Sequence, residues 1–149
     1  KLYSQLYGVP SIVLRYFNVY GPREPLKGEY APVIGLFKRQ FNNGDPMTIV
    51  EPGMQARDFT YIDDIVSANI CAMNTSTLDI PFGIYNAGTG KNYTMLDLVK
   101  LISKDNTPYY KFIPERPAEA KETLADIEST IKDLGWKPKF NLEAMINAY

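Results

Sequence analysis

The stretch SIVLRYFNVYGP, residues 11–22, decides the fold class of this chain. An apolar run at residues 11–14 passes into polar and aromatic residues and then into Gly21-Pro22. This pattern is typical of a buried parallel strand that ends at its carboxyl edge. Because ligands bind at that edge in open α/β sheets, we expect binding residues directly after residue 14.

The flanking sequence alternates between helical and strand-like patterns. Residues 1–7 resemble the end of a helix that Gly8 closes, and Thr94 with Asp97 forms a capping box before a helical apolar stripe. Strands are predicted at residues 47–50, 57–61, 82–86 and 109–113. A helix is predicted at residues 33–43, and two shorter ones begin at the Asp126 cap and at Leu142. Another helix is predicted from Asp63 or Asp64, as the N-cap, to Met73. Its apolar residues on one side are Ile62, Ile65, Val66 and Met73. This alternation indicates an α/β fold.

Composition narrows the classes of function. The chain has 149 residues, 45% hydrophobic and 22% charged, with a formal net charge of −1. We therefore expect a folded chain with no nucleic-acid partner, because it lacks the basic excess that phosphates require. A single cysteine, Cys71, and no histidine argue against a metal site and for a reducing, cytoplasmic location. No apolar run approaches the ~20 residues of a membrane span, so no membrane partner is expected.

Five short motifs in order resemble the extended short-chain dehydrogenase/reductase family, in its nucleotide-sugar epimerase/dehydratase branch. The run RYFNVYGP at residues 15–22 carries the strongest likeness. The resemblance implies the C-terminal portion of a Rossmann-type fold: the last parallel strands plus a small substrate-binding α/β domain, in a single fragment over residues 1–149. The motifs are YFN at 16–18, APVI at 31–34, TIVEPG at 48–53 leading to RDF at 57–59, NAGTG at 86–90, and PERPAE at 114–119 followed by LAD at 124–126.

The first motif implies contacts with cofactor and substrate. By the resemblance, Tyr16 and Phe17 lie against the nicotinamide of NAD, and the Asn18 amide hydrogen-bonds the diphosphate of a sugar nucleotide. A neutral amide can donate to a phosphate oxygen without burying an unpaired charge. The alternative is a strand end with buried aromatic side chains.

The next two motifs imply contacts with the nucleotide. By the resemblance, Val33 lies where family members pass backbone groups to the sugar nucleotide, but the pattern favours an ordinary helix N-terminus with Pro32 near its start. Val50 ends the strand that flanks uracil in the family, but this chain lacks the usual aromatic residue and Gly-Asp-Gly there. Arg57 matches the arginine that grips the diphosphate, a task suited to a planar, permanently charged fork. An ion pair with Asp58 or Asp63 is the alternative.

The last two motifs differ in what they predict. NAGTG favours a tight strand-to-helix turn over a phosphate-binding loop. In the final segment the resemblance places Arg116 on the diphosphate, Glu119 on both ribose hydroxyls and Thr123 beside the C2 substituent of the sugar. A small residue at that place leaves room for an N-acetyl group. The alternative is a solvated charged loop.

Residues that the family needs for chemistry are missing from this sequence. It contains neither the G-x-x-G-x-x-G fingerprint nor a Tyr-x-x-x-Lys pair. The resemblance therefore implies that the N-terminal, NAD-binding half is absent, that no catalytic residue lies in this chain, and that the chain alone is inactive and binds NAD at most weakly. Strands at 11–14 and 82–86 would then lack neighbours, so we expect a homodimer or higher self-association.

The parent protein is most similar to NAD-dependent UDP-glucose and UDP-N-acetylglucosamine 4-epimerases. In these isomerases NAD oxidises the C4 hydroxyl, the 4-keto sugar rotates, and hydride returns to the other face. A UDP-sugar is the expected ligand. Nucleotide-sugar dehydratases, UDP-glucuronate decarboxylases and heptose-nucleotide epimerases share residues 15–22, but R-P-x-E at 116–119 favours a UDP-sugar epimerase. A non-catalytic nucleotide-sugar-binding or assembly module is the alternative from another class.

Overall fold

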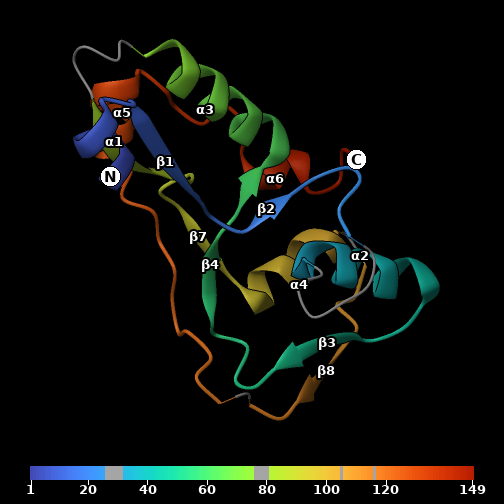
Figure 1. Ribbon diagram of the computed structural model, residues 1–149. Coiled ribbons are helices and arrows are strands. Elements are labelled where there is room, and N and C mark those ends of the chain that lie inside the picture. Colours follow the sequence, from blue (N-terminus) through green and yellow to red (C-terminus); the bar gives the residue numbers. More distant parts are fainter. Residues whose placement is uncertain (26–31, 76–80, 105, 116) are drawn as a thin grey trace.

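The computed structural model describes residues 1–25, 32–75, 81–104, 106–115 and 117–149. Its elements gather in two groups, one around β1 and α3 and one around α2, α4, β3 and β8 (Figure 1). Arg116, and Ala31 of the 31–34 motif, lie outside the described residues.

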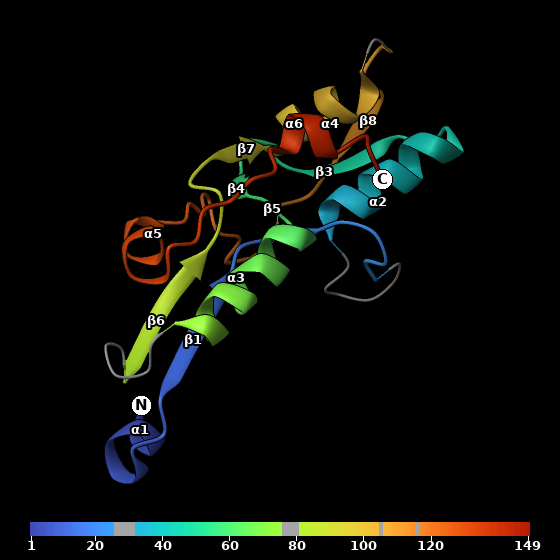
Figure 2. The same cartoon turned by 90° about the horizontal axis from the view of Figure 1, so that it is seen from above.

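The first group is built on two parallel strands. β1 (Ser11–Tyr16) pairs with β6 (Phe82–Ala87), in register from Ser11 opposite Phe82 to Tyr16 opposite Ala87. α3 (Ile62–Asn74) lies along this pair, and α5 (Glu128–Leu134) packs against β6 (Figure 2). α1 (Leu2–Tyr7) precedes β1 and ends at Gly8 in the left-handed conformation, as the sequence predicts. The buried side chains shared by these elements are Ile65, Ala68, Tyr85, Ala87, Leu134 and Trp136.

The second group packs helices against another parallel pair. β3 (Met47–Val50) pairs with β8 (Tyr110–Ile113). α2 (Val33–Asn43), α4 (Met95–Ser103) and α6 (Leu142–Met145) contribute to the same core, which contains Ile34, Phe37, Met47, Leu98 and Leu142. α4 begins with the predicted capping box, and the hydrogen bond from Thr94 lowers the pKa of Asp97.

Short strands join the two groups. β2 (Val19–Tyr20) pairs in parallel with β5 (Thr60–Tyr61), and β4 (Ala56–Asp58) pairs antiparallel with β7 (Asn92–Thr94). The single strand predicted at residues 57–61 is therefore divided in two. The division falls at Phe59, whose side chain is 3% exposed, and each half finds its own partner strand.

The prediction for the start of α3 is wrong. The helix begins at Ile62 after Tyr61, and no side chain caps it. The Asp64 carboxylate instead accepts hydrogen bonds from the backbone N–H groups of Lys139 (2.9 Å) and Phe140 (3.1 Å). Val66 and Met73, expected on the buried side, are exposed, Met73 by 83%, because Ile65 and Ala68 define the face that packs on the strands.

The start of α5 also differs in detail. The helix begins at Glu128 after Ile127, which makes no side-chain cap. Asp126 still accepts the Glu128 N–H at 3.0 Å, so its carboxylate serves the helix end from one position further out. Over the part of the chain that the structure describes, no helix has the length and apolar character to cross a membrane, and no cluster of His, Cys, Asp or Glu could hold a metal ion.

Candidate functional site

β4 and the segment 119–123 place an arginine beside a glutamate. Arg57 Nη2 lies 2.9 Å from Glu119 Oε1, and Arg57 Nη1 donates to the carbonyl of Ala56 at 2.9 Å. The two side chains are only 13% and 25% exposed, so the pair is better shielded from water than a surface ion pair. Neither Asp58 nor Asp63, the partners considered for Arg57 from the sequence, takes this role.

Main-chain hydrogen bonds hold that segment against β4. The Ala56 N–H donates to the carbonyl of Lys121 at 2.9 Å, and the Thr123 N–H donates to the carbonyl of Ala56 at 3.0 Å. Residues 121–123 thus run parallel to β4 and join it by an isolated bridge between Ala56 and Glu122, on the opposite edge from β7. This pairing sets where Glu119 and Thr123 lie along the direction of β4 relative to Arg57.

Asn18 joins the same site from the end of β1. Its Nδ2 donates to the carbonyl of Asp58 at 2.7 Å and to Thr123 Oγ1 at 3.3 Å. Asn18 has φ of 30°, in the left-handed region that asparagine tolerates better than most residues. The structure therefore brings together four predicted site residues, Asn18, Arg57, Glu119 and Thr123.

Asp58 is the residue that sequence analysis missed. It is fully buried, and its carboxylate accepts hydrogen bonds from the N–H and hydroxyl of Thr89 and from the N–H groups of Gly90 and Ala125. The NAGTG loop is thus a turn that surrounds the chain's own carboxylate, in line with the predicted turn. The available signal was an acidic residue inside the strand predicted at residues 57–61.

A tyrosine opposite Arg57 completes the surroundings of β4. Tyr93 on β7 is the register partner of Arg57. Burial raises the pKa of Tyr93 above its ordinary value, and the Lys91 ammonium lies 4.7 Å from the centre of its ring.

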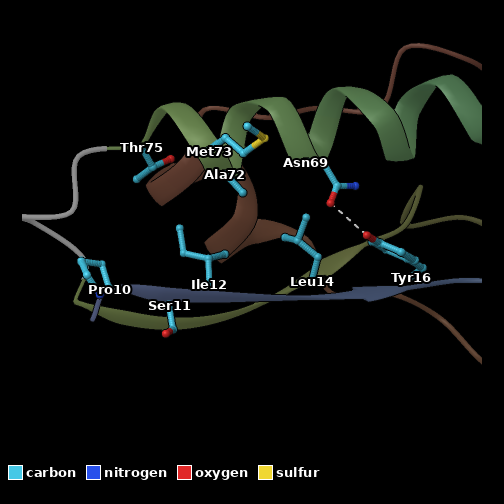
Figure 3. Close-up of a pocket in the computed structure, with 9 residues that line it drawn as sticks. All are labelled: Pro10, Ser11, Ile12, Leu14, Tyr16, Asn69, Ala72, Met73 and Thr75. Carbon is cyan, nitrogen blue, oxygen red and sulfur yellow. Dashed lines mark hydrogen bonds between the residues drawn. The ribbon is translucent and has the colours of Figure 1, made fainter. Parts of the chain in front are cut away.

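The residues predicted to meet NAD lie at the end of β1. The Tyr16 hydroxyl donates to Asn69 Oδ1 at 3.0 Å, and the Phe17 N–H donates to the carbonyl of Ala87 at 3.1 Å. Tyr16 lines a pocket of about 390 Å³ between β1 and α3 (Figure 3). The other lining residues, which include no predicted substrate-binding residue, are Pro10, Ser11, Ile12, Leu14, Asn69, Ala72, Met73 and Thr75.

Two predicted residues, Val33 and Val50, lie apart from the group of four formed around β4. Val33, the first residue of α2, packs against the hydrophobic core, which agrees with the alternative of an ordinary helix start. Val50 ends β3 opposite Ile113, and its carbonyl accepts the N–H of Gly53 at 2.9 Å. Arg116, the remaining predicted ligand of the diphosphate, lies outside the described residues.

Comparison with known proteins identifies the family. The family model of the NAD dependent epimerase/dehydratase family matches residues 1–88, more than half of the chain. A putative UDP-glucose 4-epimerase of Methanocaldococcus jannaschii is 37% identical over 146 residues, which are 96% of this chain and 45% of the relative. The chain thus spans less than half the length of such relatives.

Solved structures agree with the fold. The UDP-glucose 4-epimerase of Thermotoga maritima, solved with UDP-glucose, superimposes with a TM-score of 0.86 at 35% identity over 97% of this chain and 46% of that one. The UDP-N-acetylglucosamine 4-epimerase of Methanobrevibacter ruminantium, in complex with UDP-N-acetylmuramic acid, gives 0.88 at 33% identity with the same coverage. These matches confirm the resemblance drawn from the motifs and the Rossmann-type α/β fold class. The chain belongs to the NAD-dependent epimerase/dehydratase family.

Proposed function

We propose that this chain is the substrate-binding portion of an NAD-dependent UDP-sugar 4-epimerase that acts on UDP-glucose, UDP-galactose and their N-acetylated forms. The observation that carries the proposal is the convergence of Asn18, Arg57, Glu119 and Thr123 around β4. These residues come from three separate segments, and each has the chemistry that one part of a UDP-sugar requires. UDP-sugar 4-epimerases among the similar proteins support the same substrate class.

Arg57 is proposed to bind the diphosphate. Glu119 and the Ala56 carbonyl hold one donor on each terminal nitrogen, which fixes the plane of the guanidinium. The remaining N–H donors of the fork can then bond phosphate oxygens without further ordering of the side chain. Arg116 is proposed as the second diphosphate ligand.

Glu119 and Asn18 are proposed to bind the ribose and the diphosphate. Glu119 uses Oε1 for Arg57, and among the described residues its Oε2 accepts no hydrogen bond. That oxygen is suited to the ribose hydroxyls. Asn18 already directs its amide N–H groups to Asp58 and Thr123, so a bond to phosphate would replace the longer of these, the 3.3 Å contact with Thr123.

Thr123, Val33 and Val50 complete the proposed substrate set. Thr123 is proposed to border the C2 substituent of the sugar. Val33 would contribute through its backbone, since its side chain packs in the core. Val50 would lie beside the uracil without stacking on it.

NAD is the proposed cofactor of the parent protein. It would accept and return the hydride at C4 of the sugar. Tyr16 and Phe17 are proposed to contact the nicotinamide, through ring and backbone because the Tyr16 hydroxyl is already bonded to Asn69. No residue of this sequence supplies a dinucleotide fingerprint or a Tyr-x-x-x-Lys pair. The 149-residue chain should therefore bind UDP weakly, NAD still more weakly, and should not turn over UDP-galactose.

Calorimetric titration with UDP and, separately, with NAD tests this proposal. A charge-assisted contact is worth roughly 1.5–3 kcal/mol, so Arg57→Ala should weaken UDP binding about tenfold or more. Lys132→Ala is the matched control, because it removes one positive charge from an exposed position on α5. UDP binding that survives Arg57→Ala combined with Arg116→Ala, or turnover of UDP-galactose by the chain alone, would contradict the proposal.

A further inference from the structure

Asp58 is a buried carboxyl group without a cationic partner among the described residues. Its carboxylate is fully buried and accepts four hydrogen bonds: Oδ1 from the Thr89 N–H (2.9 Å) and hydroxyl (2.7 Å), Oδ2 from the N–H groups of Gly90 (2.9 Å) and Ala125 (3.2 Å). A carboxylate removed from water is strongly unfavourable unless its lone pairs are satisfied. The fold meets this requirement by bringing two distant segments to one side chain.

The main chain of Asp58 holds the remaining parts of the site. Its N–H donates to the carbonyl of Thr123 at 3.0 Å, and its carbonyl accepts the Asn18 amide at 2.7 Å. Arg57 is its neighbour in β4, and Ala125, bound to its carboxylate, is two residues beyond Thr123. Asn18 and Thr123 are thus bonded to the main chain of Asp58. Arg57 directly precedes Asp58 in β4, and Glu119 belongs to the same segment as Thr123.

The contact between the turn and the final segment leaves no space for a side chain at residue 88. A Cβ on Gly88 would overlap the Cβ of Ala125 and would lie 3.0 Å from Asp58 Oδ2. The turn at residues 88–90 therefore approaches both residues as closely as backbone can. Main-chain bonds to β4 hold residues 121–123, and the contacts of Ala125 with the Asp58 carboxylate and with Gly88 hold the same segment at a second point, two residues beyond Thr123.

We propose that Asp58 is a positioning residue of the nucleotide-sugar site, setting the distance between Arg57 and the segment Glu119–Thr123. This inference rests on the proposed function. Asp58 touches no ligand itself, because its carboxylate is buried and saturated by the protein. It acts through Arg57, Asn18 and Thr123, whose spacing must match the diphosphate, the ribose and the sugar together.

Asp58→Asn is the direct test, since it keeps the shape and replaces one acceptor oxygen by an NH₂ group that opposes N–H donors. Asp64→Asn is a matched control: Asp64 is equally buried and also accepts two backbone N–H groups, from Lys139 and Phe140, which lie outside the proposed site. Both variants should lose stability. Only Asp58→Asn should shift the amide NMR signals of Glu119 and Thr123 and the Arg57 Nε–H signal, and only it should weaken UDP binding, about tenfold, at a temperature where both are folded.

The two readouts separate this inference from the proposed function. Unchanged signals of Arg57, Glu119 and Thr123 in folded Asp58→Asn would overturn the positioning role whether or not UDP binds. Shifted signals with wild-type UDP affinity would overturn it too. Shifted signals in a protein that binds no UDP in any form would refute the proposed function and still support the positioning of these residues by Asp58. If Asp58→Asn does not fold, Thr89→Val removes the 2.7 Å hydroxyl bond to Asp58, together with the contacts of that hydroxyl with the carbonyl (3.0 Å) and the N–H (3.3 Å) of Lys91, and leaves the other three bonds to the Asp58 carboxylate in place. It should produce smaller shifts in the same signals.

A double-mutant cycle gives a readout that loss of stability alone would not change. If Asp58 acts in part through Arg57, Asp58→Asn should cost less UDP affinity in the Arg57→Ala background than in the wild type, and the remaining loss should be the part that passes through Asn18 and Thr123. Additive losses in the cycle would show that Asp58 does not act through Arg57 and would overturn the proposal.

Discussion

Thr123 is the residue at which the choice of sugar can be tested most directly. It is half-buried, and its hydroxyl lies 3.3 Å from the Asn18 amide, so it belongs to the proposed substrate cluster. A threonine there leaves space for an acetamido group and offers a hydroxyl to it. Thr123→Tyr should weaken binding of UDP-N-acetylglucosamine roughly ten- to a hundredfold, because overpacking a formed pocket costs about 1–3 kcal/mol.

The comparison with UDP-glucose gives this prediction its control. Competition titration should show a much smaller loss for UDP-glucose in Thr123→Tyr, and Thr123→Ser, which keeps the hydroxyl, should treat both ligands as the wild type does. Equal losses for the two ligands, or none for either, would show that Thr123 does not select the C2 substituent.

Single residues could be assigned a chemistry from the sequence but not a partner. Arg57 was expected near phosphate or near Asp58 or Asp63, yet its carboxylate partner is Glu119, 62 positions away. That pairing depends on residues 121–123 running beside β4, a main-chain contact that no local pattern announces. The sequence indicates Asp58 only as an ion-pair partner, because it does not reveal that Thr89, Gly90 and Ala125 converge on this residue.

At the scale of elements, local rules succeeded where the contacts are local. The Thr94 capping box and the Gly8 helix end join residues within one turn, and both are present as predicted. The Asp64 carboxylate also accepts backbone N–H groups, as a helix cap does. These groups belong to residues 139 and 140 instead of its own helix. Sequence proximity alone could not separate the two outcomes.

The anchoring by Asp64 predicts a large loss of stability on truncation. Asp64 is buried, and its backbone carbonyl also accepts the indole N–H of Trp136 at 3.2 Å. Asp64→Ala would leave the N–H groups of Lys139 and Phe140 without an acceptor, and we expect a loss of about 3 kcal/mol in the free energy of unfolding. Asp63→Ala, at the exposed neighbouring position, should change it by less than about 0.5 kcal/mol. Urea denaturation of both variants provides the measurement, and similar losses for the two would contradict the assigned role.

For the molecule as a whole, the α/β class followed from the alternation of patterns, but the distribution of exposed apolar surface did not. Val13 and Ile84 are exposed on the paired strands β1 and β6, and Val66, Ile70 and Met73 are exposed along α3. The sequence pattern places Val66 and Met73 on the same side of this helix as Ile65, because a helix with apolar residues on two sides gives no sign of which side finds a partner. Within the described residues, β1 pairs only with β6.

These exposed faces predict self-association of the 149-residue chain. Exposed apolar side chains and an unpaired strand edge both favour contact with a second copy, so light scattering should give masses above the 16.9 kDa of one chain as concentration rises. Ile70→Lys places a charge in the exposed stripe of α3 and should shift the distribution toward the monomer. Met54→Lys adds the same charge at another exposed apolar position, in the loop after β3, and should leave it unchanged. A monodisperse monomer at high concentration, or equal effects of the two substitutions, would show that these faces do not drive association.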